Sequence, residues 1–358
     1  MNWPLHGANA HHLYESLELP MPDKIIDFSA NLNPFGPPAG IQANWSDWFE
    51  KISDFPDPNG KELVQQIARE EGLSEDTILL GNGGAELIAL VTRMLAGKRV
   101  LLIHPTFSEY GRMCSVAGCE MTSLVLQEGD WQLRMEELIP KLAEADAVFL
   151  CHPNNPTGIV YSESLMEQII SACHEHNCLL IADEAFYDFL DNKQSVASLV
   201  NKYSNLMVIR SLTKMYAIAG LRLGYLLASP ELVRKLKSFQ PHWSVNALAL
   251  EAGKECLLDG KHAAKTRSFI SGERERILAV LKKAGYRVSP SKVNFHLLQD
   301  RALDEQLPLF RFLLKKGIVP RHTANYQGLN GRWMRFAVKQ SRQNDILLEA
   351  LLEWRTHN

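Results

Sequence analysis

Several predicted strands are followed directly by polar side chains. These include an acid, an amide and an amine, which could act together at one edge of a sheet. Asp183 stands behind four apolar residues, where a carboxylate is poorly solvated and needs a cationic partner. Asn155 and Lys214 follow strands predicted over 147–151 and 206–209. A lysine at a strand exit is, by itself, more often a solvated charge than a nucleophile. The set predicts a ligand site, because open α/β sheets bind ligands at the carboxyl ends of their strands.

A glycine-rich turn follows another predicted strand, over 77–80, and opens a helix. The backbone N–H groups of Gly83, Gly84 and Ala85 can approach an anion closely there, and the helix dipole favours negative charge. A purely structural turn explains this pattern equally well when it is taken alone. The turn is not a nucleotide-binding P-loop, because no Gly-Lys-Ser/Thr follows it.

An aromatic ring, two hydroxyls and an arginine follow the neighbouring strands, at Phe107, Ser211, Thr213 and Arg222. Together with the acid, the amide and the amine, they match what pyridoxal phosphate needs. A lysine can form the Schiff base, and an acid can pair with the pyridinium nitrogen. An asparagine can bond the ring oxygen, an aromatic ring can stack on the cofactor, and hydroxyl, arginine and helix N–H groups can bind phosphate.

The composition places this site in an ordinary globular protein. The chain has 358 residues, 46% hydrophobic and 22% charged, with a formal net charge of -3. This near-balance argues against binding of nucleic acid or a membrane surface through bulk charge. The six cysteines form no Cys-x-x-Cys pair, and the histidines lack further ligands at metal spacing, so no metal site is expected. The start resembles no secretory signal and no segment is long and apolar enough to span a bilayer, so we expect a cytoplasmic protein with free thiols.

The chain divides into three predicted regions. Residues 1–44 look like an irregular arm that packs with a small domain, 45–245 like a large α/β domain, and 246–358 like a smaller α+β domain. Short apolar strands separated by helices predict a mostly parallel sheet covered on both faces. Helices are predicted over 61–71, 85–95, 108–117, 164–176 and 345–355, with 241–283 largely helical, and strands over 77–80, 99–103, 147–151, 178–182, 206–209, 223–228, 293–298 and 334–338.

The order of these motifs resembles the fold-type-I pyridoxal-phosphate enzymes over nearly the whole chain. The segments that carry the resemblance are Gly81-Asn82-Gly83, Pro105-Thr106-Phe107, Pro153-Asn154-Asn155-Pro156-Thr157-Gly158, Asp183-Glu184-Ala185-Phe186, Ser211-Leu212-Thr213-Lys214 and Gly220-Leu221-Arg222-Leu223-Gly224.

The branch that the chain resembles holds the histidinol-phosphate aminotransferases and the L-threonine O-3-phosphate decarboxylases of cobalamin synthesis. The opening His6-Gly7-Ala8-Asn9 is similar to the decarboxylases, and Leu32 stands where the aminotransferases usually carry Glu. The resemblance implies a homodimer with active sites at the subunit interface. It also implies decarboxylation of threonine phosphate to (R)-1-amino-2-propanol O-2-phosphate.

The resemblance implies roles for matching residues. Lys214 and Asp183 would be catalytic, as the Schiff-base lysine and the pyridinium partner. The cofactor would be held by Gly83, Gly84, Ala85, Phe107, Asn155, Asp183, Ser211, Thr213, Lys214 and Arg222. The doubly anionic substrate needs at least two anchors, for which the candidates are His6, Asn31, Asn155, Arg321, Arg335 and Lys339.

Two departures from the aminotransferase pattern leave alternatives open. Phe186 stands where a tyrosine usually bonds the cofactor ring oxygen, and Phe55 where the family commonly offers a tyrosine to the phosphate across the dimer. Either change is also explained by a packing swap between aromatic rings. The alternative function is that of a histidinol-phosphate aminotransferase. The residues do not decide which anchor takes the substrate carboxylate and which the phosphate.

Overall fold

The structure is a computed structural model that describes residue 4, residues 6–192 and residues 195–357. The expectation that the chain lacks a secretory signal rests partly on residues 1–3 and 5, which lie outside the described residues. In the described part, no helix has both the length and the apolar composition that a membrane span requires.

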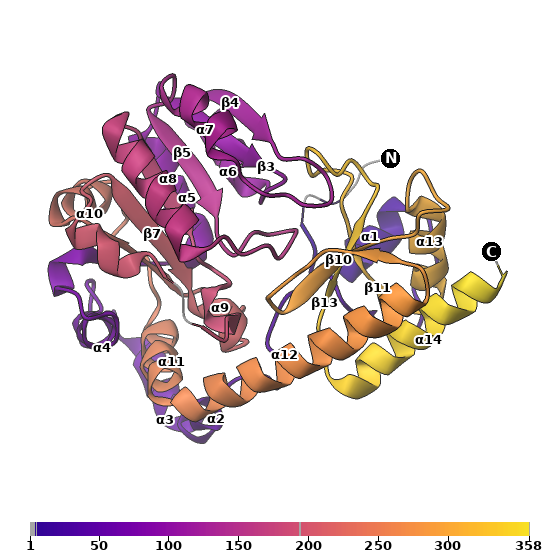
Figure 1. The fold of residues 1–358 in the computed structure, drawn as a ribbon. Coiled ribbons are helices and arrows are strands. Elements are labelled where there is room, and N and C mark those ends of the chain that lie inside the picture. The colour runs from indigo at the N-terminus through magenta and orange to yellow at the C-terminus, as the bar shows by residue number, and fades with distance from the viewer. Residues whose placement is uncertain (1–3, 5, 193–194, 358) are drawn as a thin grey trace.

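A seven-stranded sheet forms the larger part of the molecule (Figure 1). All of its strands run parallel except β8, which is antiparallel to both of its neighbours. The parallel strands therefore bring their carboxyl ends to one edge, as the sequence predicts. In spatial order the strands are β2 (Ile78–Gly81), β8 (Gly224–Ala228), β7 (Leu206–Ser211), β6 (Leu179–Asp183), β5 (Ala147–Cys151), β3 (Arg99–His104) and β4 (Glu120–Val125).

Helices cover both faces of this sheet, because every strand except the edge strand β4 is apolar on both sides. Alternate side chains of these six strands pack against different helices. One face packs on α5 (Gly83–Met94), α6 (Glu109–Val116) and α10 (Pro230–Lys237). The other packs on α4 (Lys61–Glu71), α7 (Met135–Leu142) and α8 (Glu163–Glu175).

A second, smaller sheet lies beside the first and carries two long helices that run side by side (Figure 1). Its order is β12–β13–β10–β9, with all neighbours antiparallel. The bounds are β9 (Arg287–Val288), β10 (Phe295–Gln299), β12 (Arg321–His322), β13 (Met334–Ala337), α12 (Gly260–Lys283) and α14 (Ser341–His357). Further α-helices are α2 (Ala39–Ala43), α3 (Trp45–Phe49), α9 (Leu212–Met215), α11 (Ala247–Leu258) and α13 (Leu307–Lys315).

The amino-terminal arm is irregular over most of its described length, as predicted, but it also contains regular elements that the sequence analysis did not predict. It contains α1 (Ala10–Ser16) and β1 (Ile26–Asp27), and β1 pairs in parallel with β11 (Ile318–Val319). The Asn9 side chain accepts a hydrogen bond from the His12 amide and caps the helix. The Tyr14 hydroxyl donates to the Leu314 carbonyl oxygen at 2.6 Å. A helix of seven residues is marginal in isolation, so this tertiary contact, invisible in the local sequence, stabilises it.

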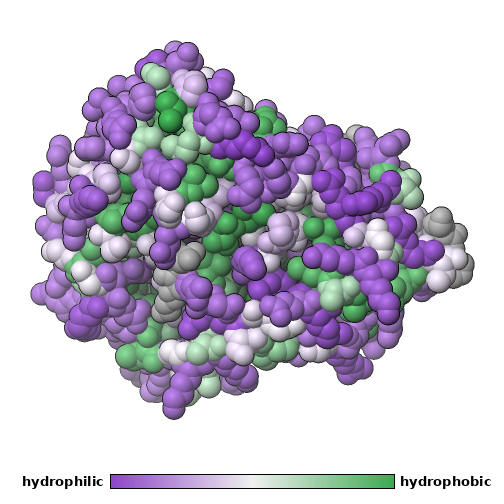
Figure 2. Space-filling view, viewed as in Figure 1, coloured by the Kyte–Doolittle hydropathy of each residue, from purple (hydrophilic) through white to green (hydrophobic). Residues whose placement is uncertain are grey.

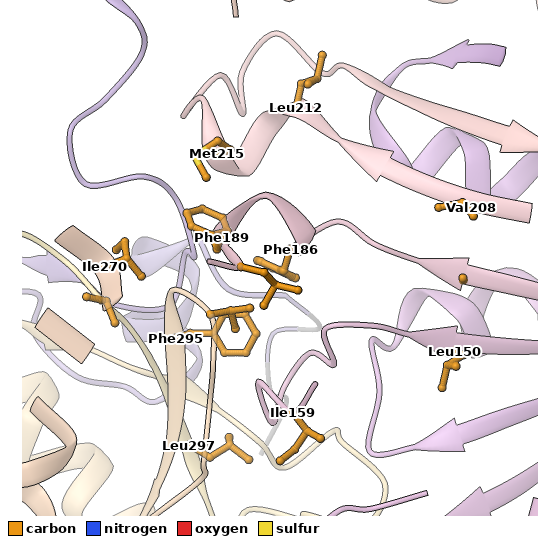
Figure 3. Packing of buried hydrophobic residues seen from close by; sticks show 14 of the residues in the cluster. Leu150, Ile159, Phe186, Phe189, Val208, Leu212, Met215, Ile270, Phe295 and Leu297 are labelled. Atoms are coloured by element: carbon orange, nitrogen blue, oxygen red, sulfur yellow. The ribbon is translucent and has the colours of Figure 1, made fainter. Parts of the chain in front are cut away.

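An apolar layer joins the two sheets at the edge where the site lies (Figure 3). Phe186, which follows β6, meets Phe295 of β10 edge-on with ring centroids 4.9 Å apart. Phe186 is buried, so the structure gives this ring a packing contact at the junction. On the face shown in Figure 2, polar residues cover the outer parts and apolar residues gather in the middle, between the two parts of the molecule.

Candidate functional site

A cavity of about 390 Å³ opens at the carboxyl ends of the large sheet, against the arm and the small sheet. Most of the predicted site residues line it, although they come from segments far apart in the chain. Gly83 and Lys339 are not among its lining residues. Those that line it are His6, Asn31, Gly84, Ala85, Phe107, Asn155, Asp183, Ser211, Thr213, Lys214, Arg222, Arg321 and Arg335.

Asp183 is the last residue of β6 and lies buried at the floor of the cavity. Its Oδ2 accepts a hydrogen bond from the Tyr110 hydroxyl at 2.5 Å, and its Oδ1 accepts one from the Ala185 amide at 3.0 Å. Burial raises the pKa of Asp183, while these two donors and the Lys214 charge oppose that rise. The carboxylate is therefore placed to hold a cationic ring nitrogen at the floor of the cavity.

Lys214 lies in the short helix α9, directly after β7, with its amine in the same cavity. Its Nζ donates to the Thr213 hydroxyl at 3.0 Å. Burial, and then the positive charge of Arg222, lower the pKa of Lys214 to about 8. An amine with this pKa is partly neutral near neutral pH, which is the form that attacks a carbonyl carbon.

We expect the cofactor-free protein to react with pyridoxal phosphate at Lys214 with a pH midpoint near 8. The neutral amine is the reactive form, so labelling fixed by borohydride should rise as the pH rises through that midpoint. Peptide mass spectrometry after brief exposure at each pH measures it, with exposed lysines as internal controls. A midpoint near 10.5 at Lys214, the ordinary lysine value, would contradict the expectation.

The glycine turn that follows β2 lies next to Arg222 at the cavity. Gly83 adopts a left-handed φ of +72°, and a Cβ there would lie 2.6 Å from Arg222 Nη2. Gly224 of β8 lets its strand pass the turn closely, since a Cβ there would lie 3.2 Å from the Gly84 amide nitrogen. The Ser211 and Thr213 hydroxyls are hydrogen bonded at 2.7 Å. This cradle of helix N–H groups, hydroxyls and a guanidinium suits a phosphate.

Alanine at Gly83 and at Gly84 should have different effects on the cofactor-free protein. Gly83→Ala is expected to lower the free energy of unfolding by about 1–3 kcal/mol, because its Cβ meets a left-handed φ and Arg222. Gly84→Ala is the matched control, expected to be neutral or slightly stabilising, since its Cβ would meet only Ile209 at 3.8 Å. Denaturant unfolding of both variants measures the difference. Equal losses of stability would show that the turn is not sterically constrained at Gly83.

Two buried arginines face the cavity from neighbouring strands of the small sheet. Arg321 of β12 pairs in register with Arg335 of β13, which places like charges directly opposite each other. Arg335 donates to the Asn155 side-chain oxygen, and to the Ser29 carbonyl oxygen at 2.8 Å. Arg321 donates to Asn325 Oδ1 at 3.0 Å. Both guanidinium groups line the cavity, where two positive charges suit an anionic ligand.

The arm adds the remaining anchor candidates. The His6 ring lies 5.9 Å from the Phe107 ring, and its Nε2 lies 2.8 Å from Glu109 Oε1. Asn31 is buried with its side-chain oxygen unpaired among the described residues. Lys339 instead donates to the Ala30 carbonyl oxygen at 3.4 Å, behind the cavity wall. The roles of these residues as substrate anchors stay predictions.

The sequence analysis did not assign Tyr110, Cys151 or Tyr326 to the site, although all three contact it or line it. Cys151 and Tyr326 line the cavity, and Tyr110 contacts Asp183 from behind it. The sequence did offer a signal for Cys151. It ends β5 as Asp183 ends β6, and the two residues pair in register, so their side chains point to the same side of the sheet. No local pattern indicates that a helical tyrosine such as Tyr110 reaches a strand-end carboxylate.

These residues fit pyridoxal phosphate in charge and shape. Asp183 suits the ring nitrogen, Phe107 a ring face, and Asn155 the ring oxygen. The turn and Arg222 suit the phosphate, with Lys214 between them. The cofactor roles remain predictions that this arrangement supports.

Known proteins resemble the chain over nearly its full length. The model of the family described as aminotransferase class I and II matches residues 23–351. A threonine-phosphate decarboxylase of Salmonella typhimurium is 38% identical over 97% of this chain and 95% of its own. A histidinol-phosphate aminotransferase of Caldanaerobacter subterraneus is 33% identical over 90% of this chain and 91% of its own.

A solved structure shares the fold closely. The histidinol-phosphate aminotransferase from Clostridium acetobutylicum has a TM-score of 0.88 at 30% identity, and the match covers 92% of this chain and 99% of that one. These similarities confirm the predicted fold class, the fold-type-I architecture of pyridoxal-phosphate enzymes. The chain belongs to the aminotransferase class I and II family.

Proposed function

We propose that this protein uses pyridoxal phosphate to decarboxylate L-threonine O-3-phosphate, yielding (R)-1-amino-2-propanol O-2-phosphate for the side chain of cobalamin. The observation that carries the proposal is the 38% identity, over 97% of the chain, to a threonine-phosphate decarboxylase. A relative from Leptospira interrogans, 29% identical over 98% of this chain but only 41% of its own length, is named an adenosylcobalamin biosynthesis bifunctional protein.

The charges around the cavity support a doubly anionic substrate as well as a cofactor phosphate. Among the described lining residues, Asp183 is the single carboxylate, whereas Lys214, Arg222, Arg321 and Arg335 carry or can carry positive charge. Arg222 belongs with the glycine turn, so Arg321 and Arg335 remain for the substrate. Two arginines suit a carboxylate and a phosphate on one small molecule, because each guanidinium can bind an oxyanion through two bonds.

The protein's own residues orient the reacting bond. Pyridoxal phosphate, when bound, supplies an electron-withdrawing ring that stabilises negative charge at the substrate α-carbon. Asp183 would hold the proton on the ring nitrogen, and Phe107 would fix the tilt of the ring. Arg321 and Arg335 would grip the two anions from one side, which determines which α-carbon bond stands perpendicular to the ring. Holding the carboxylate bond upright favours loss of CO₂ over loss of the α-proton.

Lys214 is the candidate for the closing proton transfer. Its amine lies in the same cavity, and a pKa of about 8 lets it carry or release a proton near neutral pH. Delivery of that proton from Nζ to the α-carbon, and not to the cofactor, completes decarboxylation instead of transamination.

Histidinol-phosphate aminotransferase is the second candidate. The 33% identity to one such enzyme and the TM-score of 0.88 to another support it. The two candidates share a phosphorylated amine as substrate and differ in the bond that is broken.

Product analysis separates the two functions. We expect purified, cofactor-loaded protein to release CO₂ from L-threonine O-3-phosphate and leave the cofactor as the aldehyde, with no 2-oxo acid required. Carbon dioxide capture and mass spectrometry of the aminopropanol phosphate measure this. Amino transfer from histidinol phosphate to 2-oxoglutarate without CO₂ release would contradict the decarboxylase and favour the second candidate.

We also propose that the protein is a cytoplasmic homodimer with its active sites at the subunit interface. Exposed aromatic rings support a dimer face. Phe55 is 81% exposed, and its ring centroid lies 4.8 Å from that of Trp243, which is 46% exposed. Trp45 and Phe49 are also exposed. Phe55 cannot donate a hydrogen bond, so any contact it makes with a partner's cofactor would be through its ring. Sedimentation equilibrium would contradict the dimer if it gave a mass near 40.4 kDa.

A further inference from the structure

Helix α6 carries, in its first turn, contacts to two functional groups of the site. Glu109 reaches His6 of the arm, and the next residue, Tyr110, reaches Asp183. Tyr110 is fully buried, stacked on Phe149 with centroids 4.9 Å apart and an interplanar angle of 15°. Its ring also meets Phe107 edge-on at 5.8 Å. The hydroxyl therefore has one orientation, toward the carboxylate.

The sheet explains why this contact forms. Ile181 packs on the face covered by α5 and α6, so period-two alternation directs Asp183 to that same face. A tyrosine on α6 is long enough to reach the strand end from there. The Tyr110 hydroxyl donates its hydrogen bond to Oδ2 of Asp183 from outside the cavity. Asp183 lines the cavity and Tyr110 does not, so the tyrosine leaves the space for a ligand open.

We propose that Tyr110 is a positioning residue for the cofactor, which orients Asp183 and keeps it ionised so that the carboxylate can hold the protonated ring nitrogen. This role rests on the proposed cofactor, although not on the identity of the substrate. Tyr110 itself would touch neither cofactor nor substrate and acts through Asp183.

The groups around Asp183 show why the hydroxyl matters. Tyr110 faces it from α6, the Cys151 thiol from β5 and the Lys214 amine from α9. Burial raises the pKa of Asp183, and the Tyr110 hydrogen bond is first among the contacts that lower it. Without that donor, Asp183 takes up a proton at higher pH, and a neutral carboxyl cannot pair with a cationic nitrogen.

The test measures binding of pyridoxal phosphate to the Tyr110→Phe variant as a function of pH. Phenylalanine keeps the ring contacts and removes only the hydroxyl. We expect the Kd for the cofactor at neutral pH to rise roughly tenfold, the scale of one hydrogen bond to a charged group. As the pH falls, cofactor affinity should be lost at a higher pH than in the unaltered protein, because Asp183 becomes neutral sooner.

Tyr286→Phe is the matched control. Tyr286 is also buried, and its hydroxyl donates to the Leu351 carbonyl oxygen at 2.8 Å, away from the cavity. We expect it to lower the melting temperature while leaving cofactor Kd and its pH profile unchanged. Identical cofactor binding by both variants would overturn the positioning role. Failure of the unaltered protein to bind the cofactor would instead overturn the proposed function.

A measurement on the unaltered protein keeps the test decisive if Tyr110→Phe does not fold. The infrared difference spectrum between the cofactor-free protein and its Asp183→Asn variant reports the protonation of that one carboxyl. We expect a carboxylate band at pH 7 and no protonated-carboxyl band. A protonated band at pH 7 would show that the hydroxyl does not keep Asp183 ionised, and the proposal would fail.

Discussion

Replacing Lys214 by alanine is expected to lower kcat by at least about 1,000-fold, within the range found when a group that transfers protons or attacks a carbonyl is removed. The amine lies in the cavity that also holds Asp183 and Arg222, and its pKa of about 8 suits both tasks. The variant should still bind pyridoxal phosphate, because the glycine turn, Arg222 and Asp183 remain. Borohydride should no longer fix the cofactor to the protein, and absorbance with mass spectrometry measures that loss.

Lys214→Arg is the matched control for this prediction. Arginine keeps the positive charge, but it stays protonated and cannot attack a carbonyl carbon. We expect it to be as inactive as Lys214→Ala, which would show that the neutral amine, and not the charge, is needed. Normal turnover by either variant, or borohydride fixation at another lysine, would refute the assignment of Lys214.

Replacing Arg335 by alanine is expected to raise the KM for threonine phosphate by roughly 30- to 4,000-fold, corresponding to about 2–5 kcal/mol for a buried charged anchor. Arg335 is buried, lines the cavity and donates to Asn155 and Ser29. Its removal takes away an anion-binding group and leaves the acceptors on those two residues without their donor. Steady-state kinetics with the loaded enzyme measures the change.

Two further variants test whether the increase in KM is specific to the arginines that line the cavity. Arg321→Ala should raise KM on a similar scale, because Arg321 faces the same cavity from the paired strand. Lys339→Ala should change KM much less, because the Lys339 amine donates a hydrogen bond to the Ala30 carbonyl oxygen and Lys339 does not line the cavity. A near-native KM for Arg335→Ala, or a large effect of Lys339→Ala alone, would show that the substrate is gripped elsewhere.

The central strands and their exits were predictable because each is specified locally. The strand over 147–151 is a continuous apolar run and matches β5 in both bounds, and the helix over 61–71 matches α4. Strands β6 and β7 also form where apolar runs predict them, and parallel strands must bring their carboxyl ends to one edge. The placement of Asp183, Asn155 and Lys214 in one cavity follows from that geometry.

Elements whose stability comes from distant parts of the chain were not predictable. Strand β4 (Glu120–Val125) is an edge strand with mostly exposed side chains, so no apolar run marks it. Helix α1 depends on the bond from Tyr14 to Leu314, 300 residues away. The arm's strand β1 exists only because β11 offers it a partner. Local sequence carries no signal for such pairings.

The amino-acid sequence alone determined the family, the sheet and the residues at its strand ends, because apolar runs and turn motifs act over a few neighbouring positions. Only the tertiary structure decided how those residues are held. It set Arg321 opposite Arg335, placed Lys339 behind the cavity wall and brought Tyr110 to Asp183. Each of these depends on strand register or on packing between segments far apart in the chain. Such contacts form only when burial of apolar surface offsets the entropy lost in closing long loops.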